Sequence, residues 1–428
     1  MKKNITVAIR GFKDIYSETE IKYFQKFENI ILNITKQYGI SEIKTPIVEK
    51  TELFERSIGN ETEIVNKEMY SFEDKNGESI SLRPEGTATC VRCALEKNLI
   101  FDRGIKRQKF WYSGPMFRRE RPQKGRFRQF QQFGLEYFGF DDTNSDLEII
   151  MLGNRLFEKE LQLKNIKLHI NSIGNENERA NYGDQIKSLL EKHKGILSED
   201  QQNTLTKNPI RILDTKDKKL QEILKKLPTL VSLLSNKSKQ RFENLLKKLD
   251  ESNINYIVDN SIVRGLDYYN DTVFEWKHES LGSQDAICAG GRYDNLVEKI
   301  GEVNVPAIGF AAGIERIISL LIESRSAFDA NSTVVAINHS KNSNHTCLMQ
   351  LEKLRDKFKN ISFYTTDSSS TLDKQFKQAE KFNPKYILFY DDKEINAGQY
   401  ILKDFEKNQK QEILSEDELF KKLDIINK

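Results

Sequence analysis

Apolar residues recur at helical spacing near the start of the chain and alternate with polar ones further along. The stretch Glu18–Tyr38 carries an apolar residue every three or four positions and ends before Gly39, which predicts a helix with a glycine stop. The same reasoning predicts helices over Glu52–Ile58, Thr87–Lys97 and Ser145–Leu161. Strands are predicted over Ile5–Ile9, Ile43–Val48, Met69–Phe72, Ser79–Arg83 and Lys167–Ile173.

Two aromatic runs flank an arginine-dense loop within Phe110–Gly139, and this pattern predicts a long hairpin. The loop Arg118–Arg128 holds six basic residues against one acid, with Pro122 and Gly125 marking the turn. In the return strand, a period of two places Gln132, Gly134 and Glu136 on one face. We therefore expect a polar floor beside a positively charged loop.

The segment Arg179–Ser252 changes character and reads as a helical insertion with breaks at Gly195, Pro209 and Pro228. Strand patterns resume afterwards over Asn255–Val258, Val273–Trp276 and Ala286–Ala289, and the stretch Gly309–Ser319 is expected to form the start of a helix. This order favours an α+β core with a mixed, mostly antiparallel sheet over a doubly wound fold. Neither a GxGxxG turn after a strand nor a Walker-type loop occurs in the sequence.

A polar linker at about 324–332 precedes a second region in which strands and helices alternate. Its strands are expected to begin near Thr333, Ile361, Lys385 and Gln399, and its final helix begins with a capping-box pattern, Ser415 followed by Glu418. We predict two domains, a core over 1–325 that includes the insertion at about 179–252, and an α/β domain with a largely parallel core over 331–428.

Composition narrows the class of protein. The 428 residues carry no long apolar run and no leader-like start, so we expect a cytoplasmic protein without a membrane span. Four cysteines and five scattered histidines form neither a disulfide framework nor a metal-ligand spacing, and Cys90-x-x-Cys93 lacks a second pair. No protein-bound metal is therefore expected.

The net charge of +3 is unevenly distributed. Segment Arg179–Ser252 has 16 basic and 10 acidic residues, and Arg118–Arg128 has a net charge of +5. Concentrated positive charge of this kind points to a polyanionic partner. The alternative is a solvated hairpin whose arginines keep a sheet edge soluble.

Arginines also occur in other motif-like segments, at Arg264 and Arg316 besides Arg118 and Arg126. Guanidinium groups from several segments could clamp a triphosphate and stabilise a transferring group. A second set, suited to a ligand with ammonium or N–H donors, comprises Glu85, Gln132, Glu136, Tyr268 and Tyr269. Taken singly, each arginine is more typical of a surface or ion-paired residue.

Several long motifs, in order, give the chain a resemblance to the bacterial-type histidyl-tRNA synthetases, which are class II aminoacyl-tRNA synthetases. These motifs are Ile43–Gly59 (IKTPIVEKTELFERSIG), Leu82–Thr87 (LRPEGT), Phe117–Glu136 (FRRERPQKGRFRQFQQFGLE), Arg264–Trp276 (RGLDYYNDTVFEW), Ala289–Leu296 (AGGRYDNL) and Gly309–Arg316 (GFAAGIER). The resemblance runs essentially end to end. It implies a histidine–tRNA ligase that forms histidyl-adenylate from L-histidine and ATP, and then charges tRNA(His).

The resemblance implies ATP contacts from Arg118, Glu120, Arg126, Phe130, Arg264 and Arg316. Arg118 and Arg264 would act at the α-phosphate and are the expected catalytic groups. Glu120 would hold the adenine amino group, while Phe130 would stack on the adenine ring. Arg126 and Arg316 would bind the outer phosphates, and Mg²⁺ would accompany ATP and pyrophosphate.

The resemblance also implies a histidine site made of Glu85, Thr87, Arg118, Gln132, Glu136, Arg264, Tyr268 and Tyr269. Glu85, Thr87 and Gln132 would take the α-ammonium group. Glu136 and Tyr269 would recognise the imidazole, and Tyr268 would close the pocket. Gln123, near the hairpin tip, would approach the first base pair of the tRNA acceptor stem.

Further expectations concern assembly and the second domain. The family is a homodimer with Ile43–Gly59 at the interface, the insertion would embrace the acceptor stem, and residues from about Thr333 would bind the anticodon. The sequence Ser368–Leu372 departs from the glycines that many relatives have there, so the loop is expected to differ in shape. Two rival interpretations are a regulatory subunit of an ATP phosphoribosyltransferase complex and a tRNA-sensing module of a stress kinase. The former usually lacks the anticodon domain and the intact RGLDYY motif, and the latter has a kinase domain.

Overall fold

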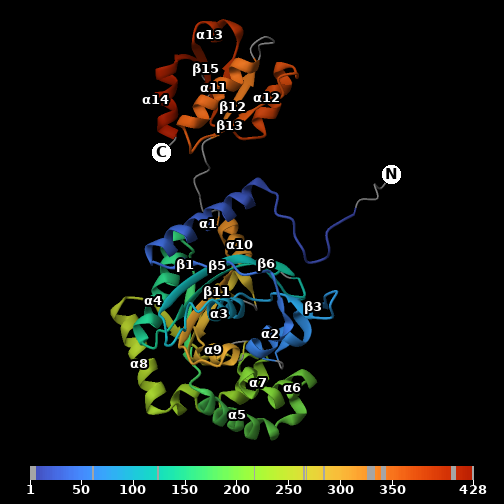
Figure 1. Cartoon of the computed structure of the whole chain (residues 1–428), viewed down its shortest axis with the longest axis vertical. Coiled ribbons are helices and arrows are strands. Elements are labelled where there is room, and N and C mark those ends of the chain that lie inside the picture. The colour runs from blue at the N-terminus through green and yellow to red at the C-terminus, as the bar shows by residue number, and fades with distance from the viewer. Residues whose placement is uncertain are drawn as a thin grey trace. The chain divides into compact units, whose positions relative to one another are not determined.

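The computed structural model describes residues 6–59, 62–122, 125–215, 217–263, 266, 268–282, 285–324, 333–338, 344–405 and 411–426. The chain divides into two compact units, Met1–Ser326 and Ala327–Lys428. Each unit has its own sheet, shown with its helices in Figure 1.

An eight-stranded sheet forms the centre of the first unit, with the order β1-β5-β6-β11-β10-β9-β7-β8. Its strands are β1 (Ser41–Glu42), β5 (Gln108–Phe117), β6 (Gln129–Phe138), β7 (Lys167–Ser172), β8 (Tyr256–Val258), β9 (Asn270–Lys277), β10 (Ala286–Arg292) and β11 (Ala307–Gly313). The pairs β1–β5 and β7–β8 are parallel, and the other pairs are antiparallel. The predicted α+β core with a mostly antiparallel sheet is confirmed.

The strands β5 and β6 form the predicted hairpin, and β6 lies inside the sheet between β5 and β11. On one face of β6, Phe133 packs against Phe27 of helix α1 (Glu18–Gln37), with ring centroids 6.3 Å apart. Gln132 and Glu136 lie on the opposite face because side chains alternate along a strand. The hairpin is therefore a central element, which excludes the interpretation of a solvated edge.

Helices cover the sheet on both sides (Figure 1). They are α1 (Glu18–Gln37), α2 (Thr51–Ile58), α3 (Thr87–Glu96), α4 (Thr143–Asn154), α9 (Asp294–Gly301) and α10 (Ile314–Glu323), with π-helical segments at Ile64–Glu68 and Arg155–Glu160. A small sheet of β2 (Val48–Lys50), β4 (Ser79–Leu82) and β3 (Tyr70–Glu73) precedes α3 in the chain. The hairpin of β3 and β4 leads into α3, and the N-terminus of α3 lies against the polar face of β6, where Gly86 N–H donates a hydrogen bond to Gln132.

The segment between β7 and β8 is helical, as predicted. It comprises α5 (Glu176–Glu191), α6 (Glu199–Lys207), α7 (Lys218–Leu224) and α8 (Asn236–Glu251). The chain turns through short 3-10 segments at Lys194–Ile196, Pro209–Asp214 and Leu230–Leu233. Gly195 and Pro209, two of the predicted breaks, lie in these turns because neither residue favours a continuing helix.

Three predicted elements differ from the structure. No strand occurs over residues 6–9, the part of Ile5–Ile9 that the structure describes. The predicted strand Ile43–Val48 is interrupted. Ile43 still donates a hydrogen bond to the Trp111 carbonyl at 2.9 Å, but Pro46 has no N–H to continue the ladder, and the next strand begins only at Val48. The helix expected within Gly309–Ser319 starts at Ile314, and Gly309 belongs to β11.

The second unit has a five-stranded sheet with the order β13-β12-β14-β15-β16. Its elements are β12 (Thr333–Asn338), α11 (Asn344–Lys357), β13 (Ser362–Thr365), α12 (Leu372–Glu380), β14 (Tyr386–Tyr390), α13 (Asp392–Asn396), β15 (Gln399–Asp404), β16 (Gln411–Ser415) and α14 (Glu416–Ile426). The strands β13, β12 and β14 are parallel, whereas β15 and β16 are antiparallel additions, so the core is less parallel than predicted.

Local polar contacts fix two features of the second unit. The Ser415–Glu418 capping box is present, since each residue's backbone N–H donates to the other's side chain. In the loop with serines in place of glycines, the Asp367 carboxylate accepts hydrogen bonds from the backbone of Ser369 and the hydroxyl of Ser370. Side-chain hydrogen bonds thus hold a loop that lacks glycine.

Candidate active site

A cavity of about 340 Å³ opens over the polar face of β6 and of the next two strands in the sheet, β11 and β10. It is lined by residues from distant parts of the sequence. Those among the predicted site residues are Glu85, Thr87, Arg118, Glu120, Arg126, Phe130, Gln132, Tyr268, Tyr269 and Arg316. Arg264 and Gln123 lie outside the described residues.

Three arginines form one side of the cavity. Arg118 donates from Nε to the Pro84 carbonyl at 2.8 Å, and its guanidinium group lies 5.3 Å from the centroid of the Phe130 ring. Burial, together with the nearby positive charge of Arg126, lowers the pKa of Arg316 to about 10. At neutral pH these arginines concentrate positive charge at a partly desolvated site, which favours a polyanion such as a triphosphate.

Glu120 is the acid among these arginines. Its carboxylate accepts a hydrogen bond from Arg126 at 2.7 Å, and it lies 3.7 Å from Arg118. The contact holds both arginine side chains in place, so they do not have to be ordered when an anion binds.

Gly125 brings the hairpin loop against the start of α10. Its φ of +67° lies in the left-handed region that glycine tolerates, and an added Cβ would lie 3.1 Å from Cγ of Arg316. A larger residue here would strain the loop and displace Arg316.

The other end of the cavity is acidic. Glu85 lines it, and Glu136, which is 1% exposed, does not reach the cavity itself but lies behind Thr87, which does. The Glu136 carboxylate accepts hydrogen bonds from Thr87 at 2.7 Å, from Tyr112 at 3.3 Å and from the Tyr293 hydroxyl. Burial raises the pKa of Glu136 from 4.5 to about 8, although the hydroxyl donors oppose the shift. The group therefore titrates near neutral pH and can bind a partner that supplies a proton or a positive charge.

Glu85 and Gln132 are fixed by the entrance of α3. The two Glu85 oxygens accept the backbone N–H groups of Thr87 and Ala88 at 2.7 and 2.8 Å, which caps the helix. Gln132 Oε1 accepts the N–H of Gly86 at 3.0 Å. The Glu85 carboxylate therefore both caps α3 and lines the cavity.

Three tyrosine rings pack together beside Glu136. The ring centroids of Tyr268 and Tyr269 are 4.7 Å apart, and Tyr293 lies 5.7 Å from Tyr268 and 6.4 Å from Tyr269. This cluster encloses the acidic end of the cavity with aromatic surface.

Sequence reasoning assigned no role to three residues that shape the site. Tyr112 and Tyr293 donate to Glu136, and the Glu315 carboxylate accepts the N–H of Gln131 at 2.8 Å and lines the cavity. Burial raises the pKa of Glu315 to about 7. Tyr293 and Glu315 lie within the motifs AGGRYDNL and GFAAGIER, which was the available signal.

No group of three or more His, Cys, Asp or Glu side chains suited to a metal occurs within the part of the chain that the structure describes. The four cysteines all lie in the described ranges, and none forms a disulfide. Over the same described ranges, no helix is both long and apolar enough to cross a membrane.

Comparison with known proteins gives consistent matches over both units. Residues 11–317 match the family model described as Histidyl-tRNA synthetase, and residues 332–424 match the model described as Anticodon binding domain. The histidine–tRNA ligase of Hydrogenovibrio crunogenus is 42% identical over 420 residues, which cover 98% of this chain and 97% of that protein.

Solved structures agree with these sequence matches. The apo histidyl-tRNA synthetase of S. aureus is 29% identical, with a TM-score of 0.78 over 99% of this chain and 100% of that chain. An ATP phosphoribosyltransferase regulatory subunit/histidyl-tRNA synthetase from Bacillus halodurans is 19% identical, with a TM-score of 0.63 over 91% of this chain and 99% of that chain. At that identity the likeness concerns the fold alone.

Proposed function

The chain belongs to the histidyl-tRNA synthetase family, and from that premise we propose that it activates L-histidine with ATP and transfers the histidyl group to the 3′ end of tRNA(His). The observation that carries this proposal is the cavity itself. Arginines line one side of it, and buried acids and hydroxyls form the other. The arginine side suits a triphosphate, and the side with acids and hydroxyls suits a cationic amino acid.

In the first step, the histidine carboxylate would attack the α-phosphorus of ATP in line with the departing pyrophosphate. The new bond joins a carboxylate oxygen to phosphorus, and the bond to the β-phosphate oxygen breaks with its electron pair. Arg118 would stabilise charge at the α-phosphate, while Arg126 and Arg316 would bind the outer phosphates. No side-chain nucleophile is needed, because positioning and charge stabilisation supply the rate enhancement.

Adenine would stack on Phe130, with Glu120 near its amino group. The contact between Arg118 and the Phe130 ring supports this arrangement, because it places the ring beside a group that binds phosphate. We propose that Mg²⁺ arrives with ATP and leaves with pyrophosphate, without a protein-ligated metal. Glu120 and Glu315 already accept hydrogen bonds from Arg126 and the Gln131 backbone, which leaves them less suited to hold a metal.

Histidine would bind at the acidic end, with its ammonium group near Glu85, Thr87 and Gln132. Glu136 would accept a hydrogen bond from the imidazole, and Tyr269 and Tyr268 would complete the pocket. The burial of Glu136 supports this assignment, since a ligand that leaves a buried polar group unpaired is rejected by as much as ~10⁴-fold.

Two further assignments concern residues outside the described ranges. We propose Arg264 as a second catalytic arginine at the α-phosphate, which also contacts histidine, and Gln123 as a contact to the acceptor stem. Replacing Arg264 with alanine should slow adenylation by roughly two to three orders of magnitude, as loss of one preorganised donor costs about 2.7–4 kcal/mol. A rate within a few-fold of the unaltered protein would remove Arg264 from the site.

For tRNA binding, we assign residues 1–325 to catalysis and 331–428 to the anticodon. The insertion, with 16 basic against 10 acidic residues, would contact the acceptor stem. Because tRNA and ATP are both cytoplasmic substrates, we place the reaction in the cytoplasm.

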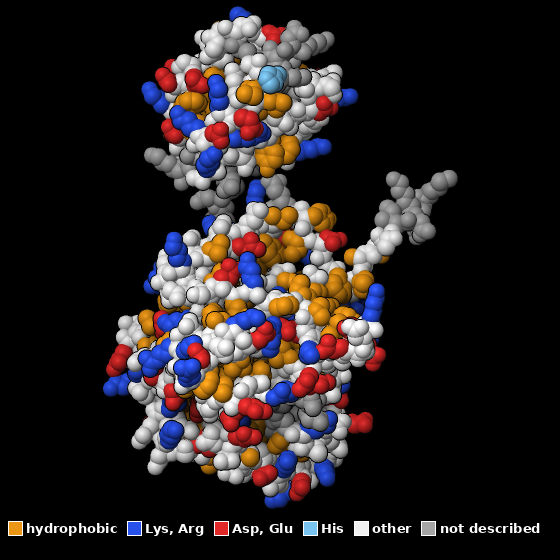
Figure 2. Space-filling view, in the orientation of Figure 1, with side chains coloured by type: hydrophobic (Ala, Val, Ile, Leu, Met, Phe, Trp, Pro, Cys, Tyr) orange, Lys and Arg blue, Asp and Glu red, His pale blue; other side chains and the backbone are white. Residues whose placement is uncertain are grey.

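We further propose a homodimer. Apolar side chains near the N-terminus and in the first motif are exposed, among them Val7 at 80%, Ile9 at 71%, Ile47 at 41% and Val48 at 41%. Figure 2 shows hydrophobic side chains interrupting the charged surface on the face of the catalytic unit in view. A second copy of the chain would cover such surface. Light scattering after gel filtration should give twice the chain mass of 49.8 kDa.

The proposed activity is tested by histidine-dependent exchange of pyrophosphate into ATP. Purified protein with histidine, ATP and Mg²⁺ should support exchange, and other amino acids should not. Charging of a tRNA(His) transcript, with and without its extra 5′ guanosine, tests the second step. Absence of exchange by folded protein would refute the proposed function.

A further inference from the structure

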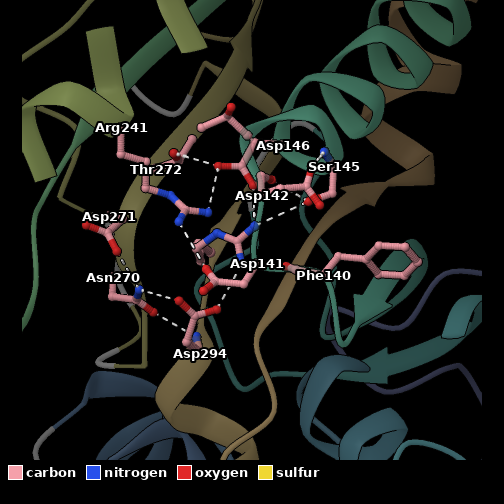
Figure 3. Close-up of polar contacts among 12 residues, drawn as sticks. Phe140, Asp141, Asp142, Ser145, Asp146, Arg241, Asn270, Asp271, Thr272 and Asp294 are labelled. Carbon is pink, nitrogen blue, oxygen red and sulfur yellow. Dashed lines mark hydrogen bonds and ion pairs between the residues drawn. The ribbon is translucent and has the colours of Figure 1, made fainter. Parts of the chain in front are cut away.

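A buried charge network lies next to the histidine end of the cavity and uses residues to which the proposed reaction gives no role. Arg292 and Asp146 are both 0% exposed, and the Arg292 guanidinium donates to the Asp146 carboxylate. Arg292 also donates to Asp294 at 3.0 Å and to the Phe140 carbonyl at 2.9 Å. Figure 3 shows these contacts converging from several segments.

The members of this network adjoin residues of the histidine pocket in the sequence. Arg292 and Asp294 flank Tyr293, whose hydroxyl donates to Glu136. Asn270 follows Tyr269 directly, and its amide donates to Asp294 at 2.9 Å. A displacement of the network would therefore move the backbone that carries Tyr269 and Tyr293.

The helical insertion contributes one charge to the network. Arg241 in α8 places Nη2 3.6 Å from Oδ2 of Asp146 and Nη1 3.0 Å from Oδ1 of Asp141. The same Asp146 oxygen accepts the Thr272 hydroxyl at 3.2 Å. In Figure 3, Arg241 and Thr272 both point toward Asp146. The insertion thus contacts the buried carboxylate that holds Arg292.

We propose that Arg241 is a positioning residue for histidine binding, acting from the insertion through Asp146 and Arg292 on Tyr293. This inference rests on the proposed function. Asp146 is buried and its charge is not solvated by water, so its position depends on the cations around it. Loss of Arg241 leaves the pair with Arg292 intact but removes the contact from the insertion, and the tyrosines then lose part of their positional restraint.

The test uses the full chain with Arg241→Met, and measures the KM for histidine and the KM for ATP in pyrophosphate exchange. We expect the KM for histidine to rise roughly fivefold, the lower end of the range typical of coupling between two sites. The KM for ATP should stay within about twofold, because the arginine side of the cavity does not touch the network. Arg241→Lys keeps the charge and should restore most of the affinity.

Lys247→Met is the matched control, since Lys247 lies in the same helix and forms an exposed pair with Glu251. It should leave both KM values unchanged. A second variant, Asp141→Asn, removes the partner of Arg241 that is 68% exposed, and it should raise the KM for histidine about twofold without affecting folding.

Several results would overturn the proposal. An unchanged KM for histidine in every variant that folds would do so, as would a parallel rise in both KM values or a failure of Arg241→Lys to restore affinity. The unaltered protein separates this inference from the proposed function. If it shows no exchange, the proposed function fails, whereas normal exchange with unaffected variants removes only the role of Arg241.

Discussion

The buried carboxylate of Glu136 makes the stability of the catalytic unit depend on pH. Folding raises its pKa from 4.5 to about 8 because burial disfavours the charged form. Between these values the folded protein binds more protons at this group than the unfolded chain does. The free energy of unfolding therefore falls as the pH rises from about 4.5 to 8.

The size of the effect follows from about 1.4 kcal/mol for each tenfold change in a protonation equilibrium. For Glu136, the free energy of unfolding should be lower by about 2 kcal/mol at pH 6 and by about 4 kcal/mol at pH 8 than it is below pH 4.5, as upper values. Glu136→Gln cannot ionise, so its advantage over the unaltered protein should grow by about 2 kcal/mol between pH 6 and pH 8. Any constant cost of the new amide cancels in this comparison.

The measurement is calorimetric unfolding of the full chain at pH 6 and pH 8. The melting temperature of the catalytic unit in Glu136→Gln should gain roughly 4 °C relative to the unaltered protein between the two values. Glu148→Gln is the control, because that side chain is 37% exposed and pairs with Lys109. Parallel curves for Glu136→Gln and the unaltered protein would refute the argument that burial shifts this group.

The same variant should bind histidine less well. Above pH 8 the Glu136 carboxylate is charged and offers the imidazole N–H an acceptor that glutamine cannot match, and hydrogen bonds to charged groups contribute about 1.5–3 kcal/mol, so this comparison is made there. The KM for histidine in pyrophosphate exchange should therefore rise roughly 10- to 100-fold. An unchanged value would exclude Glu136 from imidazole recognition.

Other predictions test packing and charge at the site. Gly309→Ala would place a Cβ 1.9 Å from Glu136 Oε2. We therefore expect thermal unfolding to show about 1–3 kcal/mol of destabilisation, and the KM for histidine to rise. Gly195→Ala is the control and should be neutral, because the space around Gly195 is open. Equal behaviour of the two variants would contradict the close packing. Arg316→Ala should lower the exchange rate roughly 10²- to 10³-fold with little loss of stability, and a normal rate would remove Arg316 from phosphate binding. Arg83→Met should destabilise by about 1–3 kcal/mol for each buried carbonyl left unpaired, because the guanidinium donates to the Pro115 and Thr45 carbonyls at 2.9 Å. An unchanged melting temperature would show that these carbonyls find other donors.

The sequence alone determined the local pattern of this protein. A period of two in β6 placed Gln132 and Glu136 on one face, and the positive loop between the aromatic runs marked the hairpin that carries Arg118. Helical spacing identified the insertion and most of the covering helices. These features depend on residues close together in the chain, where periodicity and turn chemistry are sufficient.

Tertiary structure decided what depends on distant contacts. Pro46 could occupy a strand edge, but only the neighbouring segments determine where the chain leaves the sheet. Gly309 lies in β11, paired with β6, where Glu136 and the Leu135 carbonyl fill the space that a side chain would need. The raised pKa of Glu136 likewise depends on burial and on donors such as Tyr293, which is 157 residues away in the chain. Periodicity assigns a face to a side chain, whereas desolvation and long-range pairing arise only when separate segments pack together.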